Sequence, residues 1–289
     1  MVVIPGRAPV AAVPGLPARG DAVRRLRVPL PPAHMPLWRR GSLLKRWRYV
    51  GVYAPELLLC VGHAHVGPIP RLWWATATPG GQLREGAGAG QVSMSAGRVS
   101  VDAPGARIAL ELEEGDGVET ASPAGRRGNY IWTSKRAGVV VRGTAEVDGR
   151  SHRIDGPYGF VDDSAGYHAH RTTWRWSAGI GRTQDERLAC WNLVAGIHDA
   201  PEASERTLWI DGEPREAGAV TFAEDLSEVS FAEGGALRFD EWCAREEKTN
   251  MLVVRSSYRQ PFGRFSGQLP GGCRLLEGYG VMEYHDVRW

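Results

Sequence analysis

Residues 167–177 read Tyr-His-Ala-His-Arg-Thr-Thr-Trp-Arg-Trp-Ser. Because successive side chains of a strand point to opposite faces, we expect one long strand with two unlike faces. One face carries two imidazoles, a hydroxyl and two indoles, from His168, His170, Thr172, Trp174 and Trp176. In a dry core each of these polar groups would need a buried partner. The face is more typical of a cavity that holds a mostly apolar ligand at a few polar points.

Short strands of the same kind fill most of the remaining chain. The 37 glycines separate short runs rich in Val, Thr, Trp and Tyr, as an all-β chain with many turns requires. Asp148-Gly149 and Asp211-Gly212 are typical two-residue hairpin turns. We expect roughly 16 to 18 short strands, whereas about eight already fill a small barrel. The sequence therefore predicts an all-β fold of two tandem antiparallel β-barrels or sandwiches.

An internal repeat supports two related units. Three short blocks keep their order, since residues 47–49 match 174–176, 56–60 match 186–190, and 71–74 match 206–209. The offset grows from 127 to 135 residues, as loop insertions would cause. The alternative is chance similarity between short strands rich in Trp, Arg and Leu. We expect a Pro/Arg-rich extended arm over residues 1–40, an N-terminal β-barrel over 41–155 and a C-terminal β-barrel over 156–289.

Charge is unevenly distributed although the net charge is only +2. Residues 1–50 carry ten Arg or Lys and one acid, a balance of +9, and the rest of the chain carries −7. Such an arm can bind nucleic acid or anionic lipid, but it is more often a solvated tail, and we expect no nucleic-acid partner. No apolar run reaches the roughly 18 residues of a membrane span, and the Pro-broken leader is a poor secretion signal. We expect a cytoplasmic protein without stable membrane insertion, and the oligomeric state stays open.

Candidate proton carriers lie near residues 167–177 and on the last expected strand. A carboxylate beside an imidazole of near-neutral pKa can move protons. The alternatives are structural, because Asp163 can simply form a turn and the final strand can use its polar groups to latch a barrel. The candidate catalytic residues are His168, His170, Glu283, His285 and Asp163.

A second set of residues is suited to holding a substrate. A single tryptophan on a strand is more often a core residue than a ligand contact. Together, however, Trp174, Trp176 and Trp191 can line a cavity for a polyene or terpenoid and stabilise a carbocation. Asn192 and His198 can polarise a substrate oxygen. The candidate substrate-binding residues are Tyr167, Thr172, Trp174, Trp176, Trp191, Asn192 and His198.

Motifs for metals and nucleotide cofactors are missing from the sequence. His63/His65 and His168/His170 could each direct two ligands to one side of a strand, but no third ligand follows from the spacing, so we expect no metal site. There is no Gly-x-Gly-x-x-Gly before a helix, no P-loop and no Gly-x-Ser-x-Gly elbow. We expect no cofactor.

From about Lys45 to Trp289 the chain resembles the bacterial domain-of-unknown-function family 2804. That family has no chemistry to transfer. The motifs that carry the resemblance are Lys45-Arg46-Trp47, Asp162-Asp163-Ser164-Ala165-Gly166-Tyr167-His168, Thr173-Trp174-Arg175-Trp176-Ser177-Ala178-Gly179, Trp191-Asn192-Leu193-Val194, Gly196-Ile197-His198-Asp199, Gln260-Pro261-Phe262-Gly263 and Gly280-Val281-Met282-Glu283.

A remoter resemblance is to the tandem lipocalin-like (calycin) proteins, which include carotenoid hydratases and fungal Diels–Alder cyclases. Their Tyr-His-Asp-His segment before a Trp strand is similar to residues 167–170 followed by Trp174 and Trp176. The resemblance implies two lipocalin-like barrels with an apolar cavity. Because Ala169 stands where that pattern has an acid, proton transfer here would need another group, such as Asp163, or would not occur.

These observations lead to two functional hypotheses. The first is a cofactor-independent enzyme that acts on a small apolar molecule by hydration, dehydration, isomerisation or cyclisation, gaining rate from positioning. The alternative is a non-catalytic lipocalin-like binder or carrier of a lipid-like ligand, in which the histidines only orient the ligand.

Overall fold

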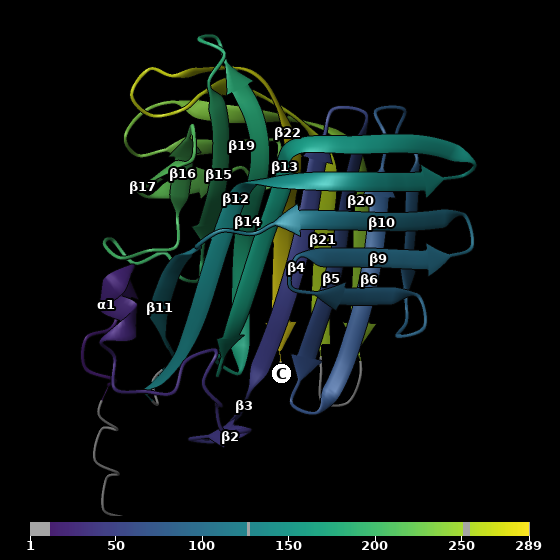
Figure 1. Ribbon diagram of the computed structural model, residues 1–289. Coiled ribbons are helices and arrows are strands. Elements are labelled where there is room, and N and C mark those ends of the chain that lie inside the picture. Colours follow the sequence, from purple (N-terminus) through teal and green to yellow (C-terminus); the bar gives the residue numbers. More distant parts are fainter. Residues whose placement is uncertain (1–11, 126–127, 251–254, 289) are drawn as a thin grey trace, which may run out of the picture.

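A computed structural model describes residues 12–125, 128–250 and 255–288. The described chain is almost entirely antiparallel β-structure, arranged in two large sheets (Figure 1). The elements outside these sheets are the short helix α1 (Asp21–Arg24) and the small hairpin of β2 (Trp38–Arg39) and β3 (Ser42–Leu43). Among the described residues, no helix is long and apolar enough to span a membrane.

The first sheet has eleven strands and is formed by the N-terminal half of the chain. Its main path runs β7-β6-β5-β4-β13-β12-β10-β9-β8, while β11 pairs with β12 and β1 pairs with β11. In chain order the strands are β1 (Ala18–Arg19), β4 (Lys45–Ala54), β5 (Leu57–Val66), β6 (Ile69–Ala77), β7 (Leu83–Ala87), β8 (Val92–Ser95), β9 (Arg98–Ala103), β10 (Ala106–Glu113), β11 (Val118–Ala124), β12 (Asn129–Val147) and β13 (Arg150–Gly166).

The second sheet has nine strands from the C-terminal half. Its order is β17-β16-β15-β14-β22-β21-β20-β19-β18. In chain order the strands are β14 (Arg171–Thr183), β15 (Leu188–Ala195), β16 (Thr207–Ile210), β17 (Glu213–Glu216), β18 (Val220–Phe222), β19 (Glu228–Phe231), β20 (Ala236–Asn250), β21 (Arg255–Gln268) and β22 (Arg274–Arg288).

The two sheets repeat one topology. If β4–β7 are matched to β14–β17, β8–β10 to β18–β20, and β12 and β13 to β21 and β22, the two strand orders are identical. The first repeat block places Trp47 on β4 and Trp174 on β14, as this match requires. The prediction of an all-β chain with two related antiparallel units is therefore confirmed, and β11 is an addition to the first unit.

The prediction of one long strand over residues 167–177 is wrong. Strand β13 ends at Gly166 in the first sheet and β14 begins at Arg171 in the second, so residues 167–170 form the crossing between the sheets. Alternation of side chains reports the extended backbone on both sides of this crossing, but it does not report a change of sheet. The expected domain junction at residues 155/156 falls within β13.

Three apolar clusters hold the sheets together. The first sheet curls around a core that includes Val50, Ile108 and Val141, and the second sheet around one that includes Trp191 and Phe265. A third cluster joins the two sheets face to face, with residues such as Tyr53 and Phe160 from the first and Trp176, Phe262 and Val281 from the second. The apolar side chains buried in this third cluster therefore hold the two sheets together as one folded unit.

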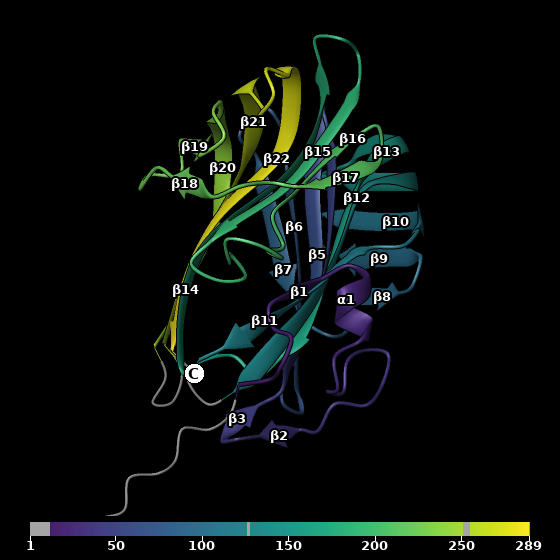
Figure 2. The ribbon, with the colours of Figure 1, turned by 90° about the vertical axis from the view of Figure 1, so that its left-hand side faces the viewer.

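The described part of the N-terminal arm packs on the first sheet, so the expectation of a solvated tail is wrong for residues 12–40. Val23 is fully buried and Met35 is 5% exposed, in a cluster with Tyr130 and Tyr167. Tyr130 also donates a hydrogen bond to the carbonyl of Pro29. Helix α1 consequently lies beside β11 on the outside of the sheet (Figures 1 and 2). Residues 1–11 lie outside the described residues.

Candidate functional site

A cavity of about 260 Å³ lies between the two sheets. Strands β4–β7, β12 and β13 supply side chains from the first sheet, and β14, β15 and β20–β22 supply them from the second. Six tryptophan and tyrosine side chains line the wall, together with aliphatic, hydroxyl and charged residues, and these six are Trp47, Tyr49, Trp73, Trp174, Trp176 and Tyr258. The equivalent strands β4, β5, β12 and β13 of the first sheet and β14, β15, β21 and β22 of the second thus all contribute to the cavity wall.

Trp73 lies flat against its neighbouring strand because that strand has a glycine there. Gly62 on β5 is paired with Trp73 on β6, and a Cβ built at Gly62 would lie 2.1 Å from the indole ring. Real atoms do not approach so closely, so only glycine leaves room for this ring. The backbone of β5 at Gly62 therefore packs directly against the indole ring of Trp73.

Glu283 is the central carboxyl of the second sheet's wall. Its side chain is only 9% exposed and accepts hydrogen bonds from Trp174 Nε1 at 2.7 Å, Tyr258 Oη at 3.0 Å and Gln260 Nε2 at 3.3 Å. Burial raises the pKa of Glu283 to about 7, although the hydrogen bonds from Trp174 and Tyr258 oppose the rise. The carboxyl can therefore exist in both protonation states near neutral pH.

His285 lies on the same face of β22, two residues beyond Glu283. Its ring is 4.4 Å from the Trp174 ring and 5.1 Å from the Tyr258 ring, measured between centroids. The Nε2 atom is 2.8 Å from Ser256 Oγ. Burial lowers the pKa of His285 to about 4, so the ring is neutral at neutral pH. It can orient a ligand or a neighbour without adding charge.

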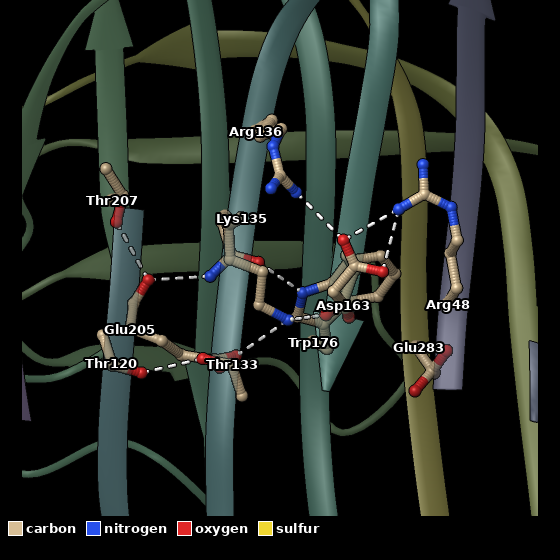
Figure 3. Close-up of polar contacts among 12 residues, drawn as sticks. Arg48, Thr120, Thr133, Lys135, Arg136, Asp163, Trp176, Glu205, Thr207 and Glu283 are labelled. Carbon is tan, nitrogen blue, oxygen red and sulfur yellow. Dashed lines mark hydrogen bonds and ion pairs between the residues drawn. The ribbon is translucent and has the colours of Figure 1, made fainter. Parts of the chain in front are cut away.

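Lys135 forms a buried charge cluster on the first sheet's wall. Its Nζ lies 2.6 Å from Asp162 Oδ1 and 3.6 Å from Glu205 Oε1, and its side chain is 4% exposed (Figure 3). Burial alone would lower the pKa of Lys135, but the two carboxylates outweigh it and raise the pKa. The ammonium is therefore a fixed positive charge facing the cavity.

Asp162 and Glu283 occupy equivalent places in the two halves. Tyr49 is paired with Asp162 across β4 and β13, and Trp176 is paired with Glu283 across β14 and β22. Because residues 47–49 repeat as 174–176, the two carboxyls are related by the repeat. Lys135 pairs with Asp162 across β12 and β13, whereas Glu283 has neutral donors in place of a lysine. One carboxyl is thus paired with a cation, whereas the other has only neutral hydrogen-bond donors.

His198 completes the cavity wall from the segment between β15 and β16. The ring is buried, and burial together with the positive charge of Lys135 lowers its pKa to about 3. Glu205, at the other end of this segment, also lines the cavity. The peptide N–H of Glu205 donates to the carbonyl of His198 at 3.0 Å, which closes the segment into a loop.

Five of the residues predicted from the sequence meet in this cavity. They come from β14, the loop after β15, and β22, and their clustering required the pairing of β14 with β22. These residues are Trp174, Trp176, His198, Glu283 and His285.

Other predicted catalytic residues lie away from the cavity lining, and their roles stay predictions. Asp163 projects from the opposite face of β13 and pairs with Arg48 and Arg136 (Figure 3). His168 is buried with its ring centroid 5.0 Å from that of Trp47. His170 is exposed, and Arg288 donates a hydrogen bond to its Nε2.

Four predicted substrate-binding residues have structural contacts outside the lining. Tyr167 donates to the carbonyl of Pro36, and Thr172 donates to that of Ala169. Trp191 lies in the core of the second sheet, where it donates to Ser177. Asn192 stands behind the wall, since it accepts a hydrogen bond from Trp176 Nε1 and donates to the carbonyl of Glu205. This residue positions two parts of the cavity without lining it.

Sequence reasoning missed several residues of the site. Lys135 is one of three lysines in the chain and lies between Trp132 and Val139 in a mostly buried strand, which was a usable signal. Glu205 and Tyr258 offered none, because a loop carboxylate and a strand tyrosine are common. Within the described ranges, no three His, Cys, Asp or Glu side chains are grouped so that they could hold a metal ion.

Comparison with solved structures gives matches at low identity. A candidate AttH protein from Nitrosomonas europaea is 12% identical, with 90% of this chain and 98% of that chain covered and a TM-score of 0.49. Kievitone hydratase from Nectria haematococca is 11% identical, with 83% and 88% covered and a TM-score of 0.48. CghA is 11% identical, with 86% and 88% covered and a TM-score of 0.46.

Among curated proteins, none matches the chain significantly. One family model does match, from residue 82 to residue 289, and it includes the strands that carry Lys135, Asp162 and Glu283. That span is most of the sequence, and the family is the one that the motifs of the second half resemble. The protein belongs to the family described as the domain of unknown function DUF2804.

Proposed function

We propose that this protein is a cofactor-independent enzyme of the lyase or isomerase type, which moves a proton on a small, largely apolar molecule. The observation that carries the proposal is Glu283, a carboxyl buried in an aromatic cavity wall and held there by three hydrogen-bond donors. Hydration, dehydration, isomerisation and cyclisation each need a proton to be added or removed, or an oxygen to be polarised.

The surroundings of Glu283 suit it to act as both general acid and general base. Trp174, Tyr258 and Gln260 stabilise the anion and fix its direction, while burial favours the protonated form. A group whose pKa lies near the working pH transfers protons most effectively in both directions. The fixed donors also keep the carboxyl from turning away from a bound molecule.

The remaining wall contributes binding and charge stabilisation. The indoles of Trp47, Trp73 and Trp174 offer flat apolar surfaces that hold a ring or polyene in one orientation, which gains rate by positioning. The Lys135 ammonium is fixed by Asp162 and faces the cavity, where it can stabilise negative charge developing on a substrate oxygen. Protonation at Glu283 and charge stabilisation at Lys135 would act on the same molecule.

The first experiment identifies the molecule and then measures proton transfer. Organic extraction of the purified protein, followed by mass spectrometry, gives the compound that the cavity retains. That compound is incubated in D2O with the wild type, with Glu283→Gln and with Glu277→Gln, a matched change on the same strand outside the cavity lining. We expect deuterium at a carbon of the compound, at a rate at least about 100-fold lower for Glu283→Gln and unchanged for Glu277→Gln.

The same experiment separates the second candidate function, binding and carriage of an apolar ligand. The aromatic side chains of the wall favour binding and carriage, because a carrier needs no titrating group. A retained compound that takes up no deuterium and is released unchanged would identify a carrier. Equal exchange rates in the wild type and Glu283→Gln would assign the proton transfer to another residue.

A further inference from the structure

One end of the cavity contains buried polar atoms without hydrogen-bond partners. Both ring nitrogens of His198 and the Oε2 atom of Glu205 lack a partner among the described residues. The two residues are 7% and 3% exposed, and both line the cavity. Buried polar atoms in native proteins are nearly always paired. These three atoms therefore indicate a partner that comes from outside the chain.

The loop that carries these groups is held in place on several sides. Besides the bond between its own ends, the carbonyl of Glu205 accepts hydrogen bonds from Asn192 Nδ2 at 2.8 Å and Thr207 Oγ1 at 3.0 Å. Arg19 from the N-terminal segment donates to the carbonyl of Ser204 and to Thr207 Oγ1. The open polar atoms are thus presented by a fixed loop, as a preformed binding site requires.

The charges around the loop select the kind of group that can bind. Glu205 is a hydrogen-bond acceptor and lies beside Lys135. The negative charge of a ligand carboxylate would be repelled by Glu205, and the positive charge of a ligand ammonium would be repelled by Lys135. A neutral His198 ring has one N–H donor and one nitrogen acceptor. A neutral O–H group can pair with one open atom of each residue, because it donates to Glu205 Oε2 and accepts from the N–H of the His198 ring. The other ring nitrogen is then an acceptor for a second O–H donor, such as water.

We propose that His198 and Glu205 form a hydroxyl-binding subsite, and that the substrate is an alcohol or phenol with an apolar body that extends from this subsite toward Glu283. The inference rests on the proposed function only in placing the reacting end of the molecule at Glu283. In the second sheet, Trp176 on β14 is paired with Glu283 on β22 and with Val194 on β15. Two strand spacings, about 10 Å, therefore separate β22 from β15, which leads into the loop. This length corresponds to about two fused rings.

The test compares two probes that differ by one hydroxyl, 2-naphthol and naphthalene. Quenching of tryptophan fluorescence gives a dissociation constant for each probe with the wild type, His198→Asn and Glu205→Gln. Asn at position 198 keeps the backbone relaxed, because the residue has a φ of 53° and Asn tolerates the left-handed region. His63→Asn, on β5 outside the cavity lining, is the matched control.

We expect the wild type and His63→Asn to bind 2-naphthol at least about tenfold more tightly than naphthalene, since a hydrogen bond to a charged group contributes that much. His198→Asn and Glu205→Gln should lose this preference while their affinity for naphthalene stays the same. Equal binding of the two probes to the wild type, equal loss of both in the variants, or no binding of either would overturn the subsite.

Glu283→Gln separates this inference from the proposed function. The variant keeps the loop, so the preference for 2-naphthol should remain even where deuterium exchange is lost. If the preference is present and exchange does not depend on Glu283, the subsite stands and the catalytic role fails. If exchange depends on Glu283 and the hydroxyl has no effect on binding, the catalytic role stands and the subsite fails.

Discussion

Replacing Glu283 by Gln should change how the stability of the protein depends on pH. The carboxyl is 9% exposed, and burial raises its pKa from the ordinary value of 4.5 to about 7. In the unfolded chain it ionises near its ordinary value. Between these two values the folded protein therefore holds a proton that the unfolded chain has released.

The sign and the size follow from this difference in bound protons. The protonated carboxyl contributes its stability fully below pH 4.5, and that stability is lost as the pH rises through 7. The whole interval corresponds to about 3 kcal/mol, of which about 2.5 kcal/mol is lost between pH 5 and pH 8. His198 and His285 have lowered pKa values and contribute the opposite slope at the acidic end, so the wild-type curve alone mixes these effects.

Urea unfolding of the wild type and Glu283→Gln at pH 5 and pH 8 isolates the carboxyl. The histidines are common to both proteins and cancel in the comparison. Between pH 5 and pH 8 the wild type should lose about 2.5 kcal/mol of unfolding free energy more than the variant does. Any constant cost of the amide, such as a weaker bond to Trp174, cancels as well. Parallel curves for the two proteins would refute the raised pKa and with it the basis for acid and base catalysis.

Two further changes test the buried charges and the packing of the second sheet. Lys135→Met leaves Asp162 and Glu205 buried without their cation, so the free energy of unfolding in urea should fall by about 3 to 5 kcal/mol. Lys248 is exposed, and Lys248→Met is the control. A similar small loss in both variants would show that Lys135 does not stabilise the two carboxylates. Gly179→Ala places a Cβ 2.1 Å from the fully buried ring of Trp191, so thermal unfolding should show a loss of about 3 kcal/mol or more. Gly90→Ala, with open space at its Cβ, should be nearly neutral, and an equally neutral Gly179→Ala would contradict the packing described for Trp191.

The sequence predicted the repeat but not every consequence of it. Matching of residues 47–49 with 174–176 correctly implied two units, and the strand orders of the two sheets agree with it. The break after Gly166 was not predictable from alternation, because extended residues look alike whether they pair with the first sheet or cross to the second. For the same reason His168 and His170 were placed on one face with Trp174, although they precede its strand.

The candidate site shows the same division between local and long-range information. Glu283 and His285 share a face because they are two residues apart on one strand, which the sequence indicates directly. Their position in one cavity with Lys135 and Glu205 depends on the packing of residues 70 or more positions apart. A spacing rule does not reach that far, so the cation and the loop carboxylate of the site were missed.

By itself, then, the sequence determined the all-β class, the presence of two related units and the shared face of residues two positions apart on one strand, such as Glu283 and His285, because backbone geometry fixes such patterns over a few residues. Only the tertiary structure decided that two equivalent faces close on one cavity, that Asp162 receives a lysine, and that Glu283 is left with neutral donors. The physical reason is burial. Removal of water between the sheets is what raises the pKa of Glu283 and leaves His198 and Glu205 open to a ligand, and no residue carries that information in its own sequence neighbourhood.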